Sequence, residues 1–223
     1  MSTMQSEENV KERFPDLNTM TAVIEGVTVK KEDTELEAFK KEFISHIRSH
    51  YDLETLKDIP ELRLYRDFFW KIGVDPTKTR PASEALIRRV IQGNPLPRIN
   101  TLVDSYNLAS MESRVPLAAF DLDTLSGEPV FRFAKKGEEF TGIGMKSPLV
   151  LEGNELVIES GSDLLAVYPH RDADKSKITL DTCDVLIVSC GVPGITASAL
   201  NHALTVAEDY IMRFCDGNIT GSL

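Results

Sequence analysis

The densest group of side chains able to bind a ligand or move a proton lies in residues 168–175, between two apolar segments. It contains His170, Arg171, Asp172 and Asp174, and loops between strands often position such groups. An imidazole that titrates near neutrality, a guanidinium and two carboxylates could hold a zwitterionic amino acid. An aspartate would bind the ammonium group, and the arginine a carboxylate or phosphate. A solvated hairpin is the structural alternative, and the residues alone leave both interpretations open.

Other polar motifs favour structural roles. His46 and His50 are four apart on one predicted helix face, a spacing suited to a metal, but no third ligand is evident and we expect surface histidines. Asp121 and Asp123 directly follow an apolar strand, a position that favours a strand-exit turn over a metal site. The chain lacks a phosphate-binding Gly-Lys-Ser/Thr loop and a Gly-x-Ser-x-Gly elbow. We therefore expect no metal and no cofactor, and no residue is identified as catalytic.

The three cysteines carry little functional information. An odd number without a Cys-x-x-Cys spacing argues against a disulfide framework and a zinc knuckle. Cys183 and Cys190 lie in or beside an apolar run, so both are expected to be buried thiols.

Charge is distributed unevenly along the 223 residues, whose net charge is -10. Residues 61–100 carry 8 Lys and Arg against 4 Asp and Glu, and the sequence on either side is acidic. An acidic protein repels nucleic-acid phosphates at long range, so we expect no DNA partner, and any RNA contact has to use this segment. A solvated helical face is the structural alternative. The candidate RNA-binding residues are Lys71, Lys78, Arg80, Arg88, Arg89 and Arg98.

Composition limits the class of protein. Hydrophobic residues make up 42% and charged residues 27%, the balance of a globular chain. No run of about 18 apolar residues is present, so no membrane partner is expected. The first residues are polar and acidic, unlike a secretory signal, and a cytoplasmic location is expected.

Periodicity predicts helices first, then a strand-rich centre, then a closing helix. Apolar spacing indicates helices over 34–50, 61–72, 82–92, 99–111 and 195–215. Short apolar runs indicate strands at 19–30, 117–120, 130–134, 149–151, 156–158, 164–168 and 185–188. The last of these is apolar throughout, as in a central strand covered on both faces. This order indicates an α+β fold, in which residues 1–60 pad a main domain of residues 61–223.

Two segments resemble a known family. Residues 96–108, with Asn100, Val103 and Asp104 in an Asn-x-x-Val-Asp pattern, precede a Phe-Asp-Leu-Asp turn within residues 115–127. Together they resemble the B3/B4 editing region of the phenylalanyl-tRNA synthetase β chain, and the likeness covers roughly residues 70–215. That domain is an α+β body that hydrolyses tyrosine wrongly attached to the phenylalanine tRNA. The resemblance implies a B3/B4-like fold with mixed sheets packed against helices, and a cleft between the 99–111 helix and the strands.

The resemblance also assigns pocket positions. A family Asn matches Asn107, and the neighbouring family Thr is Tyr106. The family His falls on Ala118, the family Glu on Val188, and a family Gly on or near Asp172. Selecting tyrosine requires a buried partner for its hydroxyl, which Val188 does not supply. A different aminoacyl-tRNA, or a free amino-acid-like ligand, fits these side chains as well.

Two functional hypotheses remain. The first is a hydrolase that edits mischarged aminoacyl-tRNA in trans. The residues that would bind the amino acid are Tyr106, Asn107, His170, Arg171, Asp172 and Asp174. Positioned water and the tRNA's own ribose hydroxyl would carry out the hydrolysis. The second is a non-catalytic module that kept the fold and binds an amino-acid-like molecule or RNA.

Overall fold

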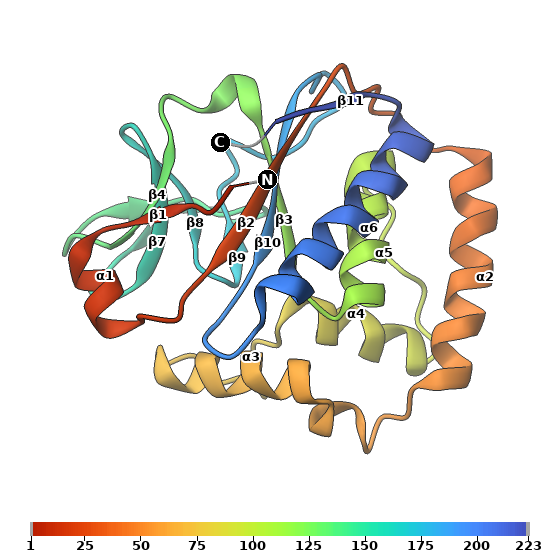
Figure 1. The fold of residues 1–223 in the computed structure, drawn as a ribbon, viewed down its shortest axis with the longest axis horizontal. Coiled ribbons are helices and arrows are strands. Elements are labelled where there is room, and N and C mark those ends of the chain that lie inside the picture. Colours follow the sequence, from red (N-terminus) through yellow and green to blue (C-terminus); the bar gives the residue numbers. More distant parts are fainter. Residues whose placement is uncertain (1, 222–223) are drawn as a thin grey trace.

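Two β-sheets meet at the centre of the molecule, and the larger helices lie on one side of them (Figure 1). The computed structural model describes residues 2–221. One sheet has the order β11-β2-β10-β3, formed by Asn218–Gly221, Thr19–Glu25, Val185–Cys190 and Leu117–Asp121. The other has the order β1-β4-β7-β8-β9, formed by Gln5–Ser6, Pro129–Phe133, Leu156–Ser160, Asp163–Val167 and Arg171–Asp172. A small hairpin joins β5 (Glu139–Phe140) to β6 (Leu149–Val150).

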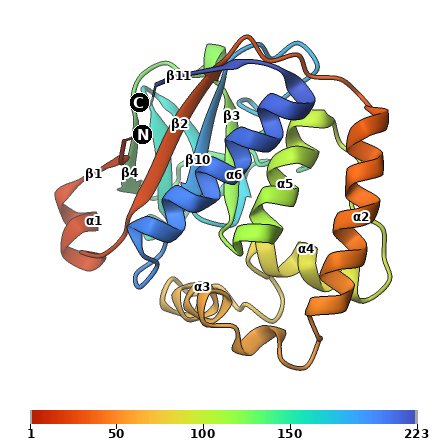
Figure 2. The same cartoon turned by 45° about the vertical axis from the view of Figure 1, so that its right-hand side comes forward.

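The helices complete the layers. They are α1 (Glu8–Arg13), α2 (Thr34–His50), α3 (Pro60–Lys71), α4 (Ala82–Ile91), α5 (Thr101–Ser113) and α6 (Ala197–Cys215). Helices α5 and α6 pack against each other and against the four-stranded sheet, with α2 outside them (Figure 2). The structure therefore confirms the predicted α+β class. None of the helices formed by residues 2–221 has the length and apolar character that a bilayer span requires.

Local sequence explains the main elements. Helix α2 begins where the Asp33 carboxylate accepts hydrogen bonds from the backbone amides of Glu35 and Leu36, which satisfies two otherwise unpaired N–H groups. Strand β10 has all six side chains buried, as predicted for a central strand. The five predicted helices are confirmed within a few residues at each end. The short elements α1, β1, β5, β9 and β11 were not predicted, because segments this short show no periodicity.

Two sequence predictions need correction. The 19–30 strand ends at Glu25, because Gly26 adopts a left-handed φ of 70° and donates its N–H to the Asp184 carboxylate at 2.9 Å. Cys183 is exposed, since it lies in the turn before β10 rather than within the strand. Cys190 is buried, as expected.

The N-terminal 60 residues contribute to the interior. Strand β2 lies between β11 and β10 and pairs with β10 in antiparallel register from Val185–Ile24 to Cys190–Thr19. Helix α2 packs against α4 and α5. The segment expected to pad the main domain therefore supplies one of the two inner strands of the four-stranded sheet.

A buried ion pair joins α2 to α5. The Lys40 ammonium lies 2.7 Å from the Asp104 carboxylate and 2.8 Å from that of Glu37. The side chains of Lys40 and Asp104 are each only 6% exposed. Asp104 also accepts the backbone N–H of Ile99 at 3.1 Å. Removing one partner of such a pair leaves an uncompensated buried charge, which costs more than the pair itself contributes.

We expect Lys40→Met to lower the free energy of unfolding by about 3 kcal/mol, measured by urea denaturation, because it strands the Asp104 carboxylate. The double variant Lys40→Met/Asp104→Asn should recover at least half of that loss, since no buried charge remains. Lys175→Met is the matched control, because its ion pair with Asp163 is exposed, and it should cost no more than about 1 kcal/mol. Equal losses for Lys40→Met and Lys175→Met would contradict this account.

Candidate functional site

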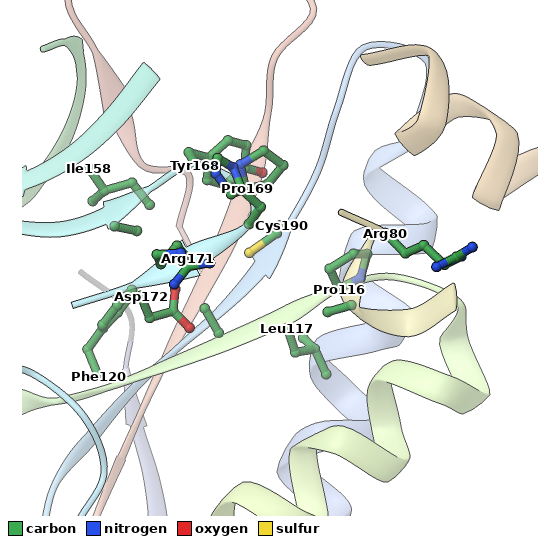
Figure 3. A pocket seen from close by; sticks show the side chains of 14 residues that line it. Arg80, Pro116, Leu117, Phe120, Ile158, Tyr168, Pro169, Arg171, Asp172 and Cys190 are labelled. Atoms are coloured by element: carbon green, nitrogen blue, oxygen red, sulfur yellow. The ribbon is translucent and has the colours of Figure 1, made fainter. Parts of the chain in front are cut away.

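A cavity of about 110 Å³ lies between the two large sheets, beside the start of α4 (Figure 3). Strands β3 and β10 form one wall, and β7, β8 and the segment that leads into β9 form the other. The lining residues are Arg80, Ala82, Pro116, Leu117, Ala118, Phe120, Ile158, Ala166, Tyr168, Pro169, His170, Arg171, Asp172 and Cys190.

Strand register explains why positions far apart in the chain meet here. Ala118 on β3 is the register partner of Val188 on β10, and cross-strand partners share one face of a sheet. Asp172 on β9 is the register partner of Ala166 on β8. Ala118, Ala166 and Asp172 line the cavity, and Val188 is two residues from the lining Cys190. The positions that the resemblance assigned to a family His, Glu and Gly therefore gather around one cavity.

Asp172 is the one carboxylate among the cavity-lining residues. It has no hydrogen-bond donor or ion-pair partner for its side chain among residues 2–221. Burial raises the pKa of Asp172 from its usual 3.8 to about 6. An unpartnered carboxylate in such a place favours a cationic ligand group that can replace the lost hydration.

His170 presents a neutral imidazole at the cavity. Its Nδ1 is buried and has no hydrogen-bond partner among the described residues. The ring packs edge-on against Phe69, with ring centroids 6.1 Å apart. Burial, followed by the charge of Arg171, lowers the pKa of His170, so the ring is uncharged at pH 7. A neutral imidazole with a free nitrogen can accept a proton or a hydrogen bond.

Arg171 is held across the β5–β6 hairpin. A Cβ atom on Gly142 would lie only 2.6 Å from Cδ of Arg171, so a larger residue at this position would displace the arginine side chain. The hairpin also pairs with the end of β9, because the N–H of Ile143 donates to the carbonyl of Asp172 at 2.9 Å. These contacts fix the backbone that carries Arg171 and Asp172.

The remaining wall is apolar and chemically unreactive. The Tyr168 hydroxyl donates to the carbonyl of Gly191 at 2.5 Å, and the ring packs edge-on against Phe131. Burial, followed by the charge of Asp172, raises the pKa of the Cys190 thiol far above its usual range. The thiol therefore stays protonated and is a poor nucleophile at neutral pH.

A basic groove adjoins the cavity. We use this name for the depression of about 560 Å³ beside α4, whose charged lining residues, Lys78, Arg80, Arg88 and Arg89, are all cationic. Arg80 lines both the groove and the cavity, which places the two side by side. The other two candidate RNA-binding residues lie elsewhere: Lys71 ends α3, and Arg98 forms an ion pair with Glu37 at 2.9 Å.

Some sequence-predicted site residues lie outside the cavity. Tyr106 and Asn107 are on α5, and neither lines it. Asn107 faces Lys40 and Asp104. Burial raises the pKa of the Tyr106 hydroxyl, and the negative charge of the neighbouring Asp172 raises it further. Asp174 forms a half-exposed ion pair with Lys177 at 2.8 Å. This cavity lies between two sheets, whereas the resemblance implied a cleft between the 99–111 helix and the strands.

The other polar motifs have structural surroundings. The rings of His46 and His50 stack at 3.9 Å on the surface of α2. The Asp121 carboxylate, rather than Asp123, caps the turn after β3 by accepting the N–H of Asp123 at 3.2 Å. Among residues 2–221, no three His, Cys, Asp or Glu side chains gather closely enough to hold a metal ion.

The raised pKa of Asp172 predicts a pH-dependent cost to folding. The neutral carboxyl is tolerated, so Asp172 does not destabilise the fold below pH 3.8, and stability falls as the pH rises through about 6. We expect Asp172→Asn to raise the free energy of unfolding by about 2 kcal/mol at pH 8 and by almost nothing at pH 4. Asp163→Asn, at an exposed ion pair, is the control and should give no gain at pH 8. Thermal denaturation of both variants at the two pH values measures this, and an equal gain at both would contradict it.

Comparison with known proteins identifies relatives in one class. Over 120 residues the chain is 35% identical to the phenylalanine–tRNA ligase beta subunit of Bacillus cereus strain ZK. The aligned segment covers 53% of this chain and 15% of that subunit. The chain is 30% identical over 116 residues to the corresponding subunit of the Wolbachia of Brugia malayi, covering 52% of this chain and 14% of the relative. The chain thus spans about one seventh of the length of these relatives.

A solved structure has the same fold. The N-terminal fragment of the phenylalanyl-tRNA synthetase beta subunit from Pyrococcus horikoshii superposes on 97% of this chain and 50% of its own length, with a TM-score of 0.50 and 15% sequence identity. The model of the B3/4 domain family matches residues 64–219, which include every residue that lines the cavity and the basic groove. The chain therefore belongs to the B3/4 domain family.

Proposed function

We propose that this protein hydrolyses the ester bond of a mischarged aminoacyl-tRNA in trans. The observation that carries the proposal is the position of Arg80, which lines both the cavity and the basic groove. A site for a charged amino acid thus opens directly onto a site for a polyanion. Related sequence occurs in phenylalanine–tRNA ligase beta subunits, which supports a tRNA-associated role.

The cavity has the groups that an aminoacyl ester requires. Asp172 lacks a partner and would bind the α-ammonium group. Arg171 and Arg80 would lie near the ester and the terminal phosphate. The ester carbonyl oxygen carries a partial negative charge and the phosphate a full one, and a guanidinium group attracts both. The four cations of the basic groove would follow the backbone of the 3′ strand, as in proteins that bind single-stranded nucleic acid.

The chemistry is a single hydrolysis. Water attacks the ester carbonyl carbon, the bond from that carbon to the ribose oxygen breaks, and the ribose oxygen takes up a proton. The amino acid leaves as a carboxylate. The Cys190 thiol is not activated, so positioned water is the nucleophile, and the neutral His170 is the side chain suited to accept its proton. The neighbouring hydroxyl of the ribose adds a further group within reach of the ester.

One observation favours a different function, a module that binds an amino-acid-like molecule without hydrolysing it. Ala118 and Val188 occupy the positions that the resemblance assigns to a family His and Glu, so two polar side chains of the family pocket are absent from this chain. Both functions use Asp172 as the ammonium ligand. They differ in whether the ester is cleaved.

Deacylation separates the two functions. Purified protein is mixed with a panel of mischarged tRNAs, and release of each amino acid is followed. We expect release of at least one amino acid and a decrease of 100-fold or more in kcat/KM for Asp172→Asn, because a charged hydrogen bond to the ammonium group is lost, worth roughly 3 kcal/mol. Asp163→Asn, a carboxylate in an exposed ion pair, should leave the rate unchanged.

The same assay tests Asn107, which the resemblance assigns to the pocket and which lies on α5 outside the cavity. We expect Asn107→Ala to reduce the rate less than Asp172→Asn does. Absence of release from every tRNA at micromolar protein would exclude the hydrolase and leave the binding module.

The basic groove predicts salt-dependent RNA binding. We expect Arg88→Glu/Arg89→Glu to weaken tRNA binding at least roughly tenfold in 0.15 M salt, and to reduce the slope of log affinity against log salt by about 1 to 2, because two phosphate contacts are lost. Filter binding across a salt series measures both. The charge-matched control is Lys11→Glu/Lys41→Glu, which changes exposed lysines on α1 and α2 and should have a much smaller effect. Equal weakening by the two double variants would show that only net charge matters.

A further inference from the structure

The free space of the cavity limits the size of the amino acid. Its 110 Å³ corresponds to about four water molecules, at roughly 30 Å³ each in the liquid. The side chains of alanine and valine have fewer non-hydrogen atoms than that. Those of phenylalanine and tyrosine have more. Lining side chains such as Phe120, Ile158 and Tyr168 are themselves closely packed, since each is no more than 1% exposed, so a larger ligand would have to displace part of the core.

The cavity has two chemically different ends. Arg80 lies at one end, and the apolar Phe120 and Ile158 lie at the other, together with Asp172 (Figure 3). Arg80 also lines the basic groove, where the RNA strand would enter. An aminoacyl ester bound this way directs its side chain away from the RNA, toward Phe120 and Ile158.

Apart from Asp172 and His170, which the proposed function assigns to the ammonium group and to the water, the wall around that side chain has no free hydrogen-bonding group among the described residues. The Tyr168 hydroxyl is engaged with the carbonyl of Gly191 at 2.5 Å. The Cys190 thiol lies 3.8 Å from the carbonyl of Val188, to which it donates. Phe120, Ile158 and Ala166 are apolar. A substrate hydroxyl placed here would lose its hydration without replacement, which disfavours it.

We propose, on the basis of the proposed function, that the aminoacyl group taken by this site has a small, apolar side chain, in the size range from alanine to valine. Size excludes the aromatic amino acids, and the apolar wall disfavours hydroxylated ones.

The test keeps the RNA constant and varies only the amino acid. One tRNA is charged in separate reactions with alanine, valine, threonine, phenylalanine and tyrosine, and kcat/KM is measured for each. We expect kcat/KM for the better of the alanyl and valyl substrates to exceed kcat/KM for the tyrosyl and phenylalanyl substrates at least 100-fold. We expect kcat/KM for the valyl substrate to exceed that for the threonyl substrate by roughly 10- to 100-fold. Ile158→Ala should enlarge the cavity and raise the relative rate for phenylalanine, and Phe120→Leu serves the same purpose if the first variant folds poorly.

The outcomes distinguish this inference from the proposed function. Release of tyrosine or phenylalanine as fast as alanine and valine overturns the size selection and leaves the hydrolase in place. If nothing is released, binding of stable 3′-aminoacylamido-adenosine analogues is measured by calorimetry. Tighter binding of the alanyl or valyl analogue than of the tyrosyl analogue then supports the size selection while the hydrolase is excluded. Equal or absent binding of all analogues overturns the inference.

Discussion

Strand β10 has no side chain in contact with bulk water, and the rest of the molecule is arranged to cover it. Helix α6 packs on β10 and β2 from one side, and the five-stranded sheet faces it from the other. A strand covered on both faces has a continuous run of apolar residues, and residues 185–188 form such a run. Closure of the second sheet over β10 is incomplete near Cys190, and the cavity is the space left there.

The chemistry of this cavity comes from the short strand β9. It is only two residues long, yet it brings Arg171 and Asp172 to the edge of the gap between the sheets. A buried, unpartnered carboxylate opposes folding at neutral pH. Groups that destabilise a fold without structural compensation are typical of binding and catalytic sites, where the ligand supplies the missing partner. Arg132, by contrast, is only 3% exposed but forms ion pairs with both Glu138 and Glu159, which marks that network as structural.

Sequence reasoning reached the fold class, the long helices and the central strand, because these depend on periodicity over many residues. It also selected residues 170–172, because charged residues between apolar strands stand out by type. It did not find the apolar members of the cavity, such as Phe120 and Ile158, which look like ordinary core residues until the packing of two sheets is known. The position of this cavity between two sheets could not be predicted for the same reason: the sequence pattern shows which face of an element is apolar, and does not show which element covers it.

The interior position of β2 has a consequence for how this domain can be divided. Residues 64–219, the part matched by the family model, exclude the strand that lies between β11 and β10. A fragment cut at these limits would present a long, apolar, unpaired edge on β10, and β11 would have no neighbour. Exposed edges of this kind pair with other chains and promote aggregation. The family boundary drawn from sequence similarity is therefore not a boundary of independent folding, and a strand from outside it is part of the smallest unit that could be excised or transplanted intact.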